Sequence, residues 1–153
     1  DELTQLFNVL KGNMSLVGPR PNVQRDVDLY SATEKKLLSV KPGITDFSSI
    51  IFSDEGDILS GLSNPDIAYN QLIRPWKSRL GILYIENQSL LLDIYLILMT
   101  VMAIINKKRA LNQISKKVES ISDNLELIEV CKRDKELVPS IPPGHDAIVT
   151  SRE

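Results

Sequence analysis

The sequence has few of the residues that build metal centres and disulfides. Its 153 residues include one cysteine, Cys131, and one histidine, His145. A single cysteine excludes an internal disulfide and fits a reducing compartment, and we expect Cys131 to be a small apolar residue on a helix rather than a reactive thiol. His145 has no nearby cysteine or second histidine, so a metal role for it is disfavoured.

The sequence also has no large excess of positive or negative charge and no long uninterrupted apolar run. The net charge is -2 and 25% of the residues are charged, so nothing points to nucleic acid. No phosphate-cradling glycine loop is present, which disfavours a soluble nucleotide-binding protein. The most apolar stretch, residues 89–105, is interrupted by Asp93 and falls short of the ~20 residues that span a bilayer. We expect it to form a buried or interfacial helix.

The first eleven residues predict an amphipathic helix. Leu3, Leu6, Phe7 and Leu10 recur at the spacing that lines one helical face, and Lys11 with a following glycine is a typical helix ending. Two carboxylates, Asp1 and Glu2, lie on its first turn. Acids there are commonly simple complements of the helix dipole, but the unpaired N–H groups also favour phosphate.

A second short segment, Gly18-Pro19-Arg20-Pro21, restricts the backbone on both sides of one arginine. The backbone therefore limits the directions that the guanidinium of Arg20 can take, and a guanidinium is a natural partner of phosphate oxygens. Taken alone, Arg20 fits a salt bridge as well. Arg25, among alternating charges, is a weaker candidate for phosphate binding.

The middle of the chain contains several local start and stop signals. Residues 31–34 have capping-box spacing and predict a helix through Leu38, and Pro42-Gly43 predicts a tight turn. Residues 47–52 are rich in aromatic and branched side chains and predict a strand. We interpret residues 54–57 as a solvated turn rather than a metal loop, because the ligand pattern of a calcium loop is absent. Asn64-Pro65 predicts a helix start, and Arg74-Pro75 a break before a helix through Glu86.

Beyond the apolar stretch come a basic cluster and an apolar seam. Residues 107–109 are all basic; they fit either attraction to an anionic membrane leaflet, which we favour, or cations at a helix C-terminus. Apolar residues from Leu111 to Ile128 alternate spacings of three and four over about three heptads. The seam can mediate dimerisation or pack on the body of the domain. Residues 139–153, with three prolines, should be extended.

Three blocks of the sequence closely resemble the bacterial sugar transferases, the monotopic phosphoglycosyl transferases. The first is DELTQLFNVLKGNMSLVGPRP, which has Asn13 where the family usually has Asp, and the second is KPGIT at residues 41–45. A weaker match surrounds Tyr84 to Asp93, and the resemblance fades after Arg109.

The resemblance implies transfer of a sugar phosphate from a nucleoside-diphosphate sugar to polyprenyl (undecaprenyl) phosphate. Asp1 would attack the sugar-proximal phosphate and form an aspartyl-phosphosugar intermediate, Glu2 would help to hold Mg²⁺, and Arg20, with Arg25 as the weaker candidate, would bind phosphate. Such enzymes initiate exopolysaccharide, O-antigen or lipopolysaccharide and other glycoconjugate synthesis at the cytoplasmic face of the bacterial inner membrane, where the membrane surface is a partner.

The implied fold is a helix-rich α/β domain with short strands, associated with the membrane. We expect residues 1–109 to form part of the catalytic core and residues 110–153 a C-terminal amphipathic helix and extended tail. Members of the family carry a membrane-inserted hairpin before their Asp-Glu pair, whereas this sequence begins abruptly on Asp1. We therefore expect the sequence to be a piece of a longer protein, and we expect this piece by itself to be inactive. Many members also have a tryptophan-bearing segment and an Asn-Gly-Arg after KPGIT, where this chain has residues 46–50, so sugar specificity does not carry over. The alternative is a non-catalytic, membrane-associated interaction module that uses the Leu111–Ile128 seam, with a homodimer as one outcome.

Overall fold

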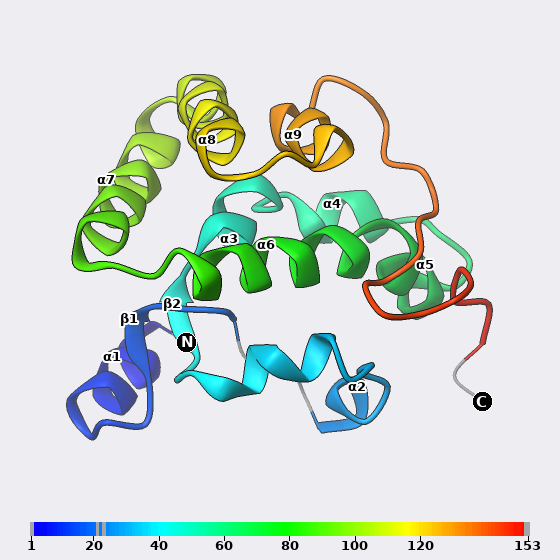
Figure 1. Ribbon diagram of the computed structural model, residues 1–153, viewed down its shortest axis with the longest axis horizontal. Coiled ribbons are helices and arrows are strands. Elements are labelled where there is room, and N and C mark those ends of the chain that lie inside the picture. Colours follow the sequence, from blue (N-terminus) through cyan, green and yellow to red (C-terminus); the bar gives the residue numbers. More distant parts are fainter. Residues whose placement is uncertain (1, 21, 23, 152–153) are drawn as a thin grey trace.

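The computed structural model describes residues 2–20, 22 and 24–151, without the side chain of Glu2. Helices dominate it, as predicted, and two short strands, β1 (Ser15–Val17) and β2 (Gly43–Thr45), form a parallel pair (Figure 1). The helices are α1 (Glu2–Leu10), α2 (Gln24–Val27), the 3₁₀ helix η1 (Glu34–Ser39), α3 (Phe47–Ile51), α4 (Glu55–Leu59), α5 (Pro65–Leu72), α6 (Arg74–Glu86), α7 (Leu90–Ile105), α8 (Lys107–Ile121) and α9 (Leu125–Lys132).

Helix α6 runs through the middle of the molecule (Figure 1). Helices α7, α8 and α9 lie above it in that view and η1 and α2 below, while α1 lies beside the strand pair. A single buried cluster joins strand β1 with helices α3, α6, α7, α8 and α9. Cys131 belongs to it, and burial raises the pKa of its thiol to about 12, so its role as an apolar core residue is confirmed.

Several local signals are confirmed. Helix α1 ends before Gly12, whose φ of +84° is the left-handed conformation expected of a helix ending. Asn64 caps α5 by accepting from the backbone N–H of Ile67, and the predicted break separates α5 from α6 at Ile73, directly before Arg74-Pro75. Ser31 and Glu34 exchange the two hydrogen bonds of a capping box, although the helix that follows is 3₁₀ rather than α.

The tight turn predicted at Pro42-Gly43 is wrong. Gly43 is instead the first residue of β2, paired with Ser15 of β1. A Cβ on Gly43 would lie 2.0 Å from the backbone nitrogen of Gly18, so glycine is needed here for close strand approach rather than for a turn.

The strand predicted at residues 47–52 is also wrong, because these residues form α3. Asp46 begins the helix: its carboxylate accepts from the backbone N–H of Ser49, whose hydroxyl lies 2.8 Å from the backbone nitrogen of Asp46. This reciprocal cap satisfies helix N–H groups, and the aromatic and branched residues that suggested a strand fill the core from a helix. The predicted turn at residues 54–57 is likewise wrong, since α4 begins at Glu55.

The predicted apolar seam divides between two helices. Helix α8 ends at Ile121 and α9 begins at Leu125, where Asn124 caps it. Leu111, Ile114 and Val118 are buried in the core, so the seam packs on the body of the molecule. This is one of the two predicted outcomes, and a homodimer stays a prediction.

The basic cluster begins α8, which Asn106 caps, instead of ending the apolar helix α7. The interpretation of these cations as helix C-terminal charges is therefore wrong. Helix α7 buries Leu92, Leu96 and Met99 and exposes most of its other large apolar residues. Among the described residues, no helix has the length and apolarity needed to cross a membrane. The division of the chain at residue 109 stays a prediction.

Candidate active site

The parallel strand pair brings together two sequence blocks that lie far apart in the chain. Strand β1 carries the end of the first block and β2 carries KPGIT, in the register Ser15 with Gly43 and Val17 with Thr45. Further backbone hydrogen bonds extend the pairing, from Gly18 N to Thr45 O at 3.0 Å and from Gly43 N to Pro19 O at 3.0 Å. The two blocks therefore form one structural unit.

The strands approach closely because glycine lies at the crossing on both sides: Gly43 in β2 and Gly18 directly after β1. A Cβ on Gly18 would lie 2.7 Å from the carbonyl oxygen of Lys41, and one on Gly43 would meet backbone atoms closer still. The chain leaves this crossing toward Arg20, whose Nη1 donates to the carbonyl oxygen of Ile44 at 2.6 Å. An arginine of the first block is thus held by the second, with other N–H donors left for a ligand.

The third block is attached to the same strand. The Tyr84 hydroxyl, on α6, donates to Asp93 Oδ1 of α7 at 2.5 Å and lies 3.5 Å from the carbonyl oxygen of Val17. Burial, and then the contact with Asp93, raises the pKa of Tyr84 well above its ordinary value, so the hydroxyl keeps its proton. Thr100 of α7 also contacts Thr45 of β2, with 2.7 Å between their hydroxyl oxygens.

The predicted nucleophile, Asp1, lies outside the described residues, and of Glu2 only the backbone, at the start of α1, is described. Their catalytic roles stay predictions. Among the described side chains, no group of three or more histidine, cysteine, aspartate or glutamate residues is placed to hold a metal ion. A carboxylate such as Glu2 is a hard oxygen donor of the kind that Mg²⁺ prefers, so the predicted site is chemically consistent with that ion.

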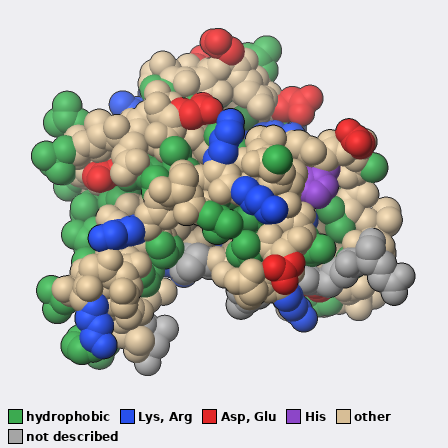
Figure 2. Space-filling view, turned by 60° about the horizontal axis from the view of Figure 1, so that its bottom comes forward, with side chains coloured by type: hydrophobic (Ala, Val, Ile, Leu, Met, Phe, Trp, Pro, Cys, Tyr) green, Lys and Arg blue, Asp and Glu red, His purple; other side chains and the backbone are tan. Residues whose placement is uncertain are grey.

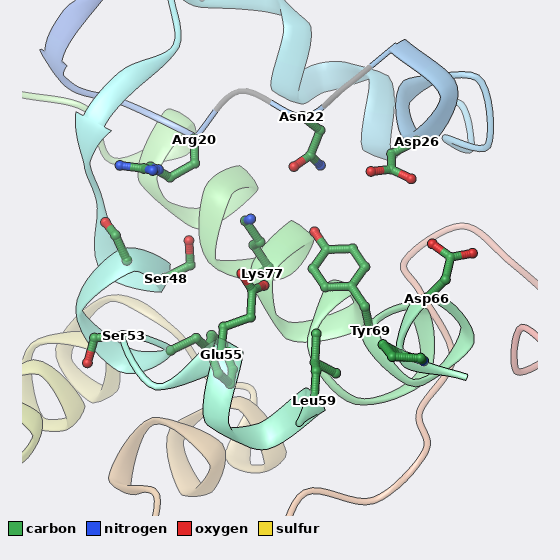
Figure 3. Close-up of a pocket in the computed structure, with 14 residues that line it drawn as sticks. Arg20, Asn22, Asp26, Ser48, Ser53, Glu55, Leu59, Asp66, Tyr69 and Lys77 are labelled. Atoms are coloured by element: carbon green, nitrogen blue, oxygen red, sulfur yellow. The ribbon is translucent and has the colours of Figure 1, made fainter. Parts of the chain in front are cut away.

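A cavity of about 780 Å³ opens beside Arg20 (Figure 3). Its walls come from the segment after Arg20 and from α2, α3, α4, α5 and α6. The residues that line it are Arg20, Asn22, Asp26, Ser48, Ser49, Phe52, Ser53, Glu55, Gly56, Leu59, Pro65, Asp66, Tyr69 and Lys77. Arg25 is not one of them: its side chain is 72% exposed and pairs with Asp66 at 3.7 Å.

Sequence reasoning missed most of this cavity. Arg20 was found because it lies in a motif, but Asn22, Tyr69 and Lys77 show no local pattern and come from segments up to 55 residues apart in the chain. Only the packing of α5 against α6, next to the segment that contains Asn22, brings them together. The Lys77 ammonium lies over the ring of Tyr69, 5.6 Å from its centroid. Burial, followed by the carboxylates of Glu55 and Asp26, raises the pKa of Tyr69.

A buried ion pair fixes α6 relative to η1 next to this cavity. Arg74, 3% exposed, binds both carboxylate oxygens of Glu34, 0% exposed, at 3.0 and 2.6 Å. Ser78 donates to the same carboxylate at 2.6 Å, and His145 of the C-terminal tail lies 3.0 Å from it. Burial alone would raise the pKa of Glu34, but the hydrogen bonds from Arg74 and Ser78 outweigh burial and hold it below its ordinary value.

Comparisons with known proteins agree with the three blocks. Residues 1–107 match the model of a family described as Bacterial sugar transferase. The chain is 37% identical over 105 residues to Galactosyl transferase CpsE of Streptococcus agalactiae serotype III, covering 69% of this chain and 20% of that protein. It is 34% identical over 110 residues to Undecaprenyl-phosphate galactose phosphotransferase of Salmonella typhimurium, covering 72% and 20%.

A third relative is the UDP-glucose:undecaprenyl-phosphate glucose-1-phosphate transferase of Xanthomonas campestris pv. campestris, 33% identical over 115 residues, covering 72% of this chain and 21% of that protein. The matched part therefore spans about a fifth of the length of these three relatives. The family model covers well over half of the chain and includes all three blocks. The chain belongs to the bacterial sugar transferase family.

Proposed function

We propose that the protein containing this chain transfers a sugar phosphate from a nucleoside-diphosphate sugar to polyprenyl phosphate. The observation that carries the proposal is the match of residues 1–107 to the family, together with relatives named as undecaprenyl-phosphate sugar phosphotransferases. The structure supports it because the matching blocks meet at one strand pair and hold Arg20 there. The reaction would initiate exopolysaccharide or another glycoconjugate.

The chemistry proposed for Asp1 divides one displacement into two. A carboxylate oxygen of Asp1 attacks the sugar-proximal phosphorus, the bond to the bridging oxygen of the donor breaks, and nucleoside monophosphate leaves. The polyprenyl phosphate oxygen then attacks the same phosphorus, the bond to Asp1 breaks, and the carboxylate is restored. Covalent catalysis of this kind replaces one difficult step with two easier ones.

The remaining residues neutralise and position the phosphates. Glu2 would hold Mg²⁺, which when bound reduces the negative charge that the phosphate oxygens present to the nucleophile. Arg20 is the stronger candidate for binding a donor phosphate, since the carbonyl of Ile44 orients its guanidinium. Arg25 is the weaker one, because it is exposed and already pairs with Asp66.

The surface supports action on a lipid acceptor at the cytoplasmic face of the inner membrane. Helix α7 exposes large apolar residues on the side away from the core, and Lys107-Lys108-Arg109 follow directly. Helix α1 exposes Leu3, Phe7 and Leu10. Figure 2 shows hydrophobic side chains gathered along the side of the molecule that α7 and α1 occupy in Figure 1. Apolar helix faces beside cations suit an anionic bilayer surface.

The alternative of a non-catalytic interaction module has no observation in its favour, because the apolar seam that it requires is largely buried in the chain. The proposed function is tested by trapping the intermediate. The full-length protein, given donor labelled in the sugar-proximal phosphate and no acceptor, should acquire a labelled phosphosugar adduct. Asp1→Asn should abolish both adduct and turnover, and Asp28→Asn, at an exposed position on the same chain, should leave both unchanged. Full turnover by Asp1→Asn would contradict the mechanism.

A further inference from the structure

The cavity beside Arg20 has a mixed electrostatic character. Two cations, Arg20 and Lys77, line it together with three carboxylates, Asp26, Glu55 and Asp66. A site for a whole diphosphate or nucleotide would be expected to be cationic, since carboxylates repel phosphate charge. The part of the cavity lined by the three carboxylates therefore suits a neutral group, and we expect the negatively charged phosphates of a donor to bind near Arg20.

The hydrogen-bonding groups that line the cavity narrow the ligand class further. Figure 3 shows Asn22, Glu55, Tyr69 and Lys77 directing their polar ends toward the middle of the cavity from four different segments of the chain. Amide and hydroxyl groups donate and accept hydrogen bonds, and a carboxylate accepts them, so together they can satisfy the hydroxyl groups of a polyhydroxylated ring. The aromatic ring of Tyr69 adds an apolar surface suited to the C–H face of such a ring.

We propose that this cavity binds the sugar of the donor through its hydroxyl groups, with Glu55 as an acceptor that selects which sugar is bound. Glu55 lies in the first turn of α4, is half-buried, and lines the cavity. A half-buried carboxylate facing a ligand hydroxyl discriminates strongly, because a sugar that lacks the hydroxyl leaves the acceptor unpaired. The volume of about 780 Å³ accommodates a hexose with its phosphate at Arg20.

This inference rests on the proposed function, because it assumes a nucleoside-diphosphate sugar as donor, and it is tested by binding rather than turnover. The full-length protein in nanodiscs, carrying Asp1→Asn so that the donor stays intact, is titrated calorimetrically with UDP, UDP-glucose and UDP-galactose. Glu55→Gln keeps an acceptor oxygen but removes its negative charge, so it should weaken binding of the preferred UDP-sugar about five- to thirtyfold, the difference between a charged and a neutral hydrogen bond, and that of UDP less than twofold.

Asp57→Asn is the matched control, because Asp57 lies on the same helix, is exposed and does not line the cavity. Added to the Asp1→Asn protein, this substitution should leave the affinity for UDP, UDP-glucose and UDP-galactose unchanged. Deoxy analogues of the preferred UDP-sugar provide a second readout. Removal of the sugar hydroxyl that donates to Glu55 should weaken binding to the protein with Glu55 intact about ten- to hundredfold, and should weaken binding to Glu55→Gln by a clearly smaller factor.

Equal losses for UDP and the UDP-sugar, no loss in Glu55→Gln, or no gain in affinity from the sugar would each overturn the inference. The two proposals fail differently. If the protein with Asp1 intact transfers no sugar phosphate while sugar-dependent binding through Glu55 persists, the proposed function alone is wrong. If transfer occurs but sugar binding is unaffected in Glu55→Gln, the sugar site alone is wrong.

Discussion

Substitution of Gly43 by alanine should separate the two strands that hold the site together. The added Cβ would lie 2.0 Å from the backbone nitrogen of Gly18 and 2.5 Å from its carbonyl oxygen, whereas ordinary contacts begin at 3.4 Å. Both neighbours are backbone atoms, so no side chain can move away to make room. One strand must shift by more than an ångström.

Such a shift breaks the hydrogen bonds on both sides of the crossing. Three of them, Ser15 N to Pro42 O, Gly18 N to Thr45 O and Gly43 N to Pro19 O, are 2.9 to 3.0 Å long and cannot stretch that far. At about 0.5–1.5 kcal/mol each, their loss should lower the free energy of unfolding by about 2–4 kcal/mol. For a chain of this length that corresponds to a fall in melting temperature of about 5–15 °C.

Urea unfolding of the 153-residue chain, followed by the fluorescence of its single tryptophan, Trp76, measures the effect. Trp76 is buried in the core and reports its exposure. Gly56→Ala is the control, because a Cβ there meets nothing within 4 Å and alanine favours the helix by up to about 1 kcal/mol. A Gly43→Ala chain as stable as the unsubstituted one would refute the account of the strand crossing.

Three further predictions concern the buried polar contacts. The stability that Glu34 gains from Arg74 is fully present above the ordinary glutamate pKa. It should be lost as the pH falls from there through the lowered pKa of Glu34 in the folded protein. Glu34→Gln should flatten this acid dependence in unfolding experiments and lower the free energy of unfolding at pH 7 by about 3–5 kcal/mol. Asp46→Ala removes the cap of α3 and should lower the unfolding free energy by about 1–2 kcal/mol in the same assay. Arg133→Lys cannot reproduce the paired contacts with Asp54 at 2.8 and 3.0 Å, so the melting temperature measured by calorimetry should fall. An unchanged melting temperature would show that this pair adds no stability.

Elements with local signals were predicted well from the sequence. Helices α1 and α5 and the break before α6 depend on periodicity, caps and proline, all of which act within a few residues. The strand predicted at residues 47–52 was wrong because branched and aromatic side chains suit any buried element. The cap at Asp46 favours a helix instead. The turn predicted at Gly43 was wrong because glycine is needed there for close approach to the backbone of Gly18, which is 25 residues away in sequence.

The site divides in the same way. Arg20 lies in a motif and between two prolines, so its sequence surroundings identified it. Glu55, Tyr69 and Lys77 come from three different helices and meet only after α4, α5 and α6 have packed. Nothing in their neighbouring residues distinguishes them from ordinary surface positions, so tertiary structure is needed to find the cavity.

The proposed transfer of sugar phosphate is tested with the full-length protein in nanodiscs with Mg²⁺, polyprenyl phosphate and a panel of nucleoside-diphosphate sugars. Release of nucleoside monophosphate is measured for the unsubstituted protein and for Asp1→Asn. The proposed mechanism requires release with at least one donor, dependent on Mg²⁺ and abolished by the substitution. Release that persists in Asp1→Asn, or no release with any donor, would contradict it.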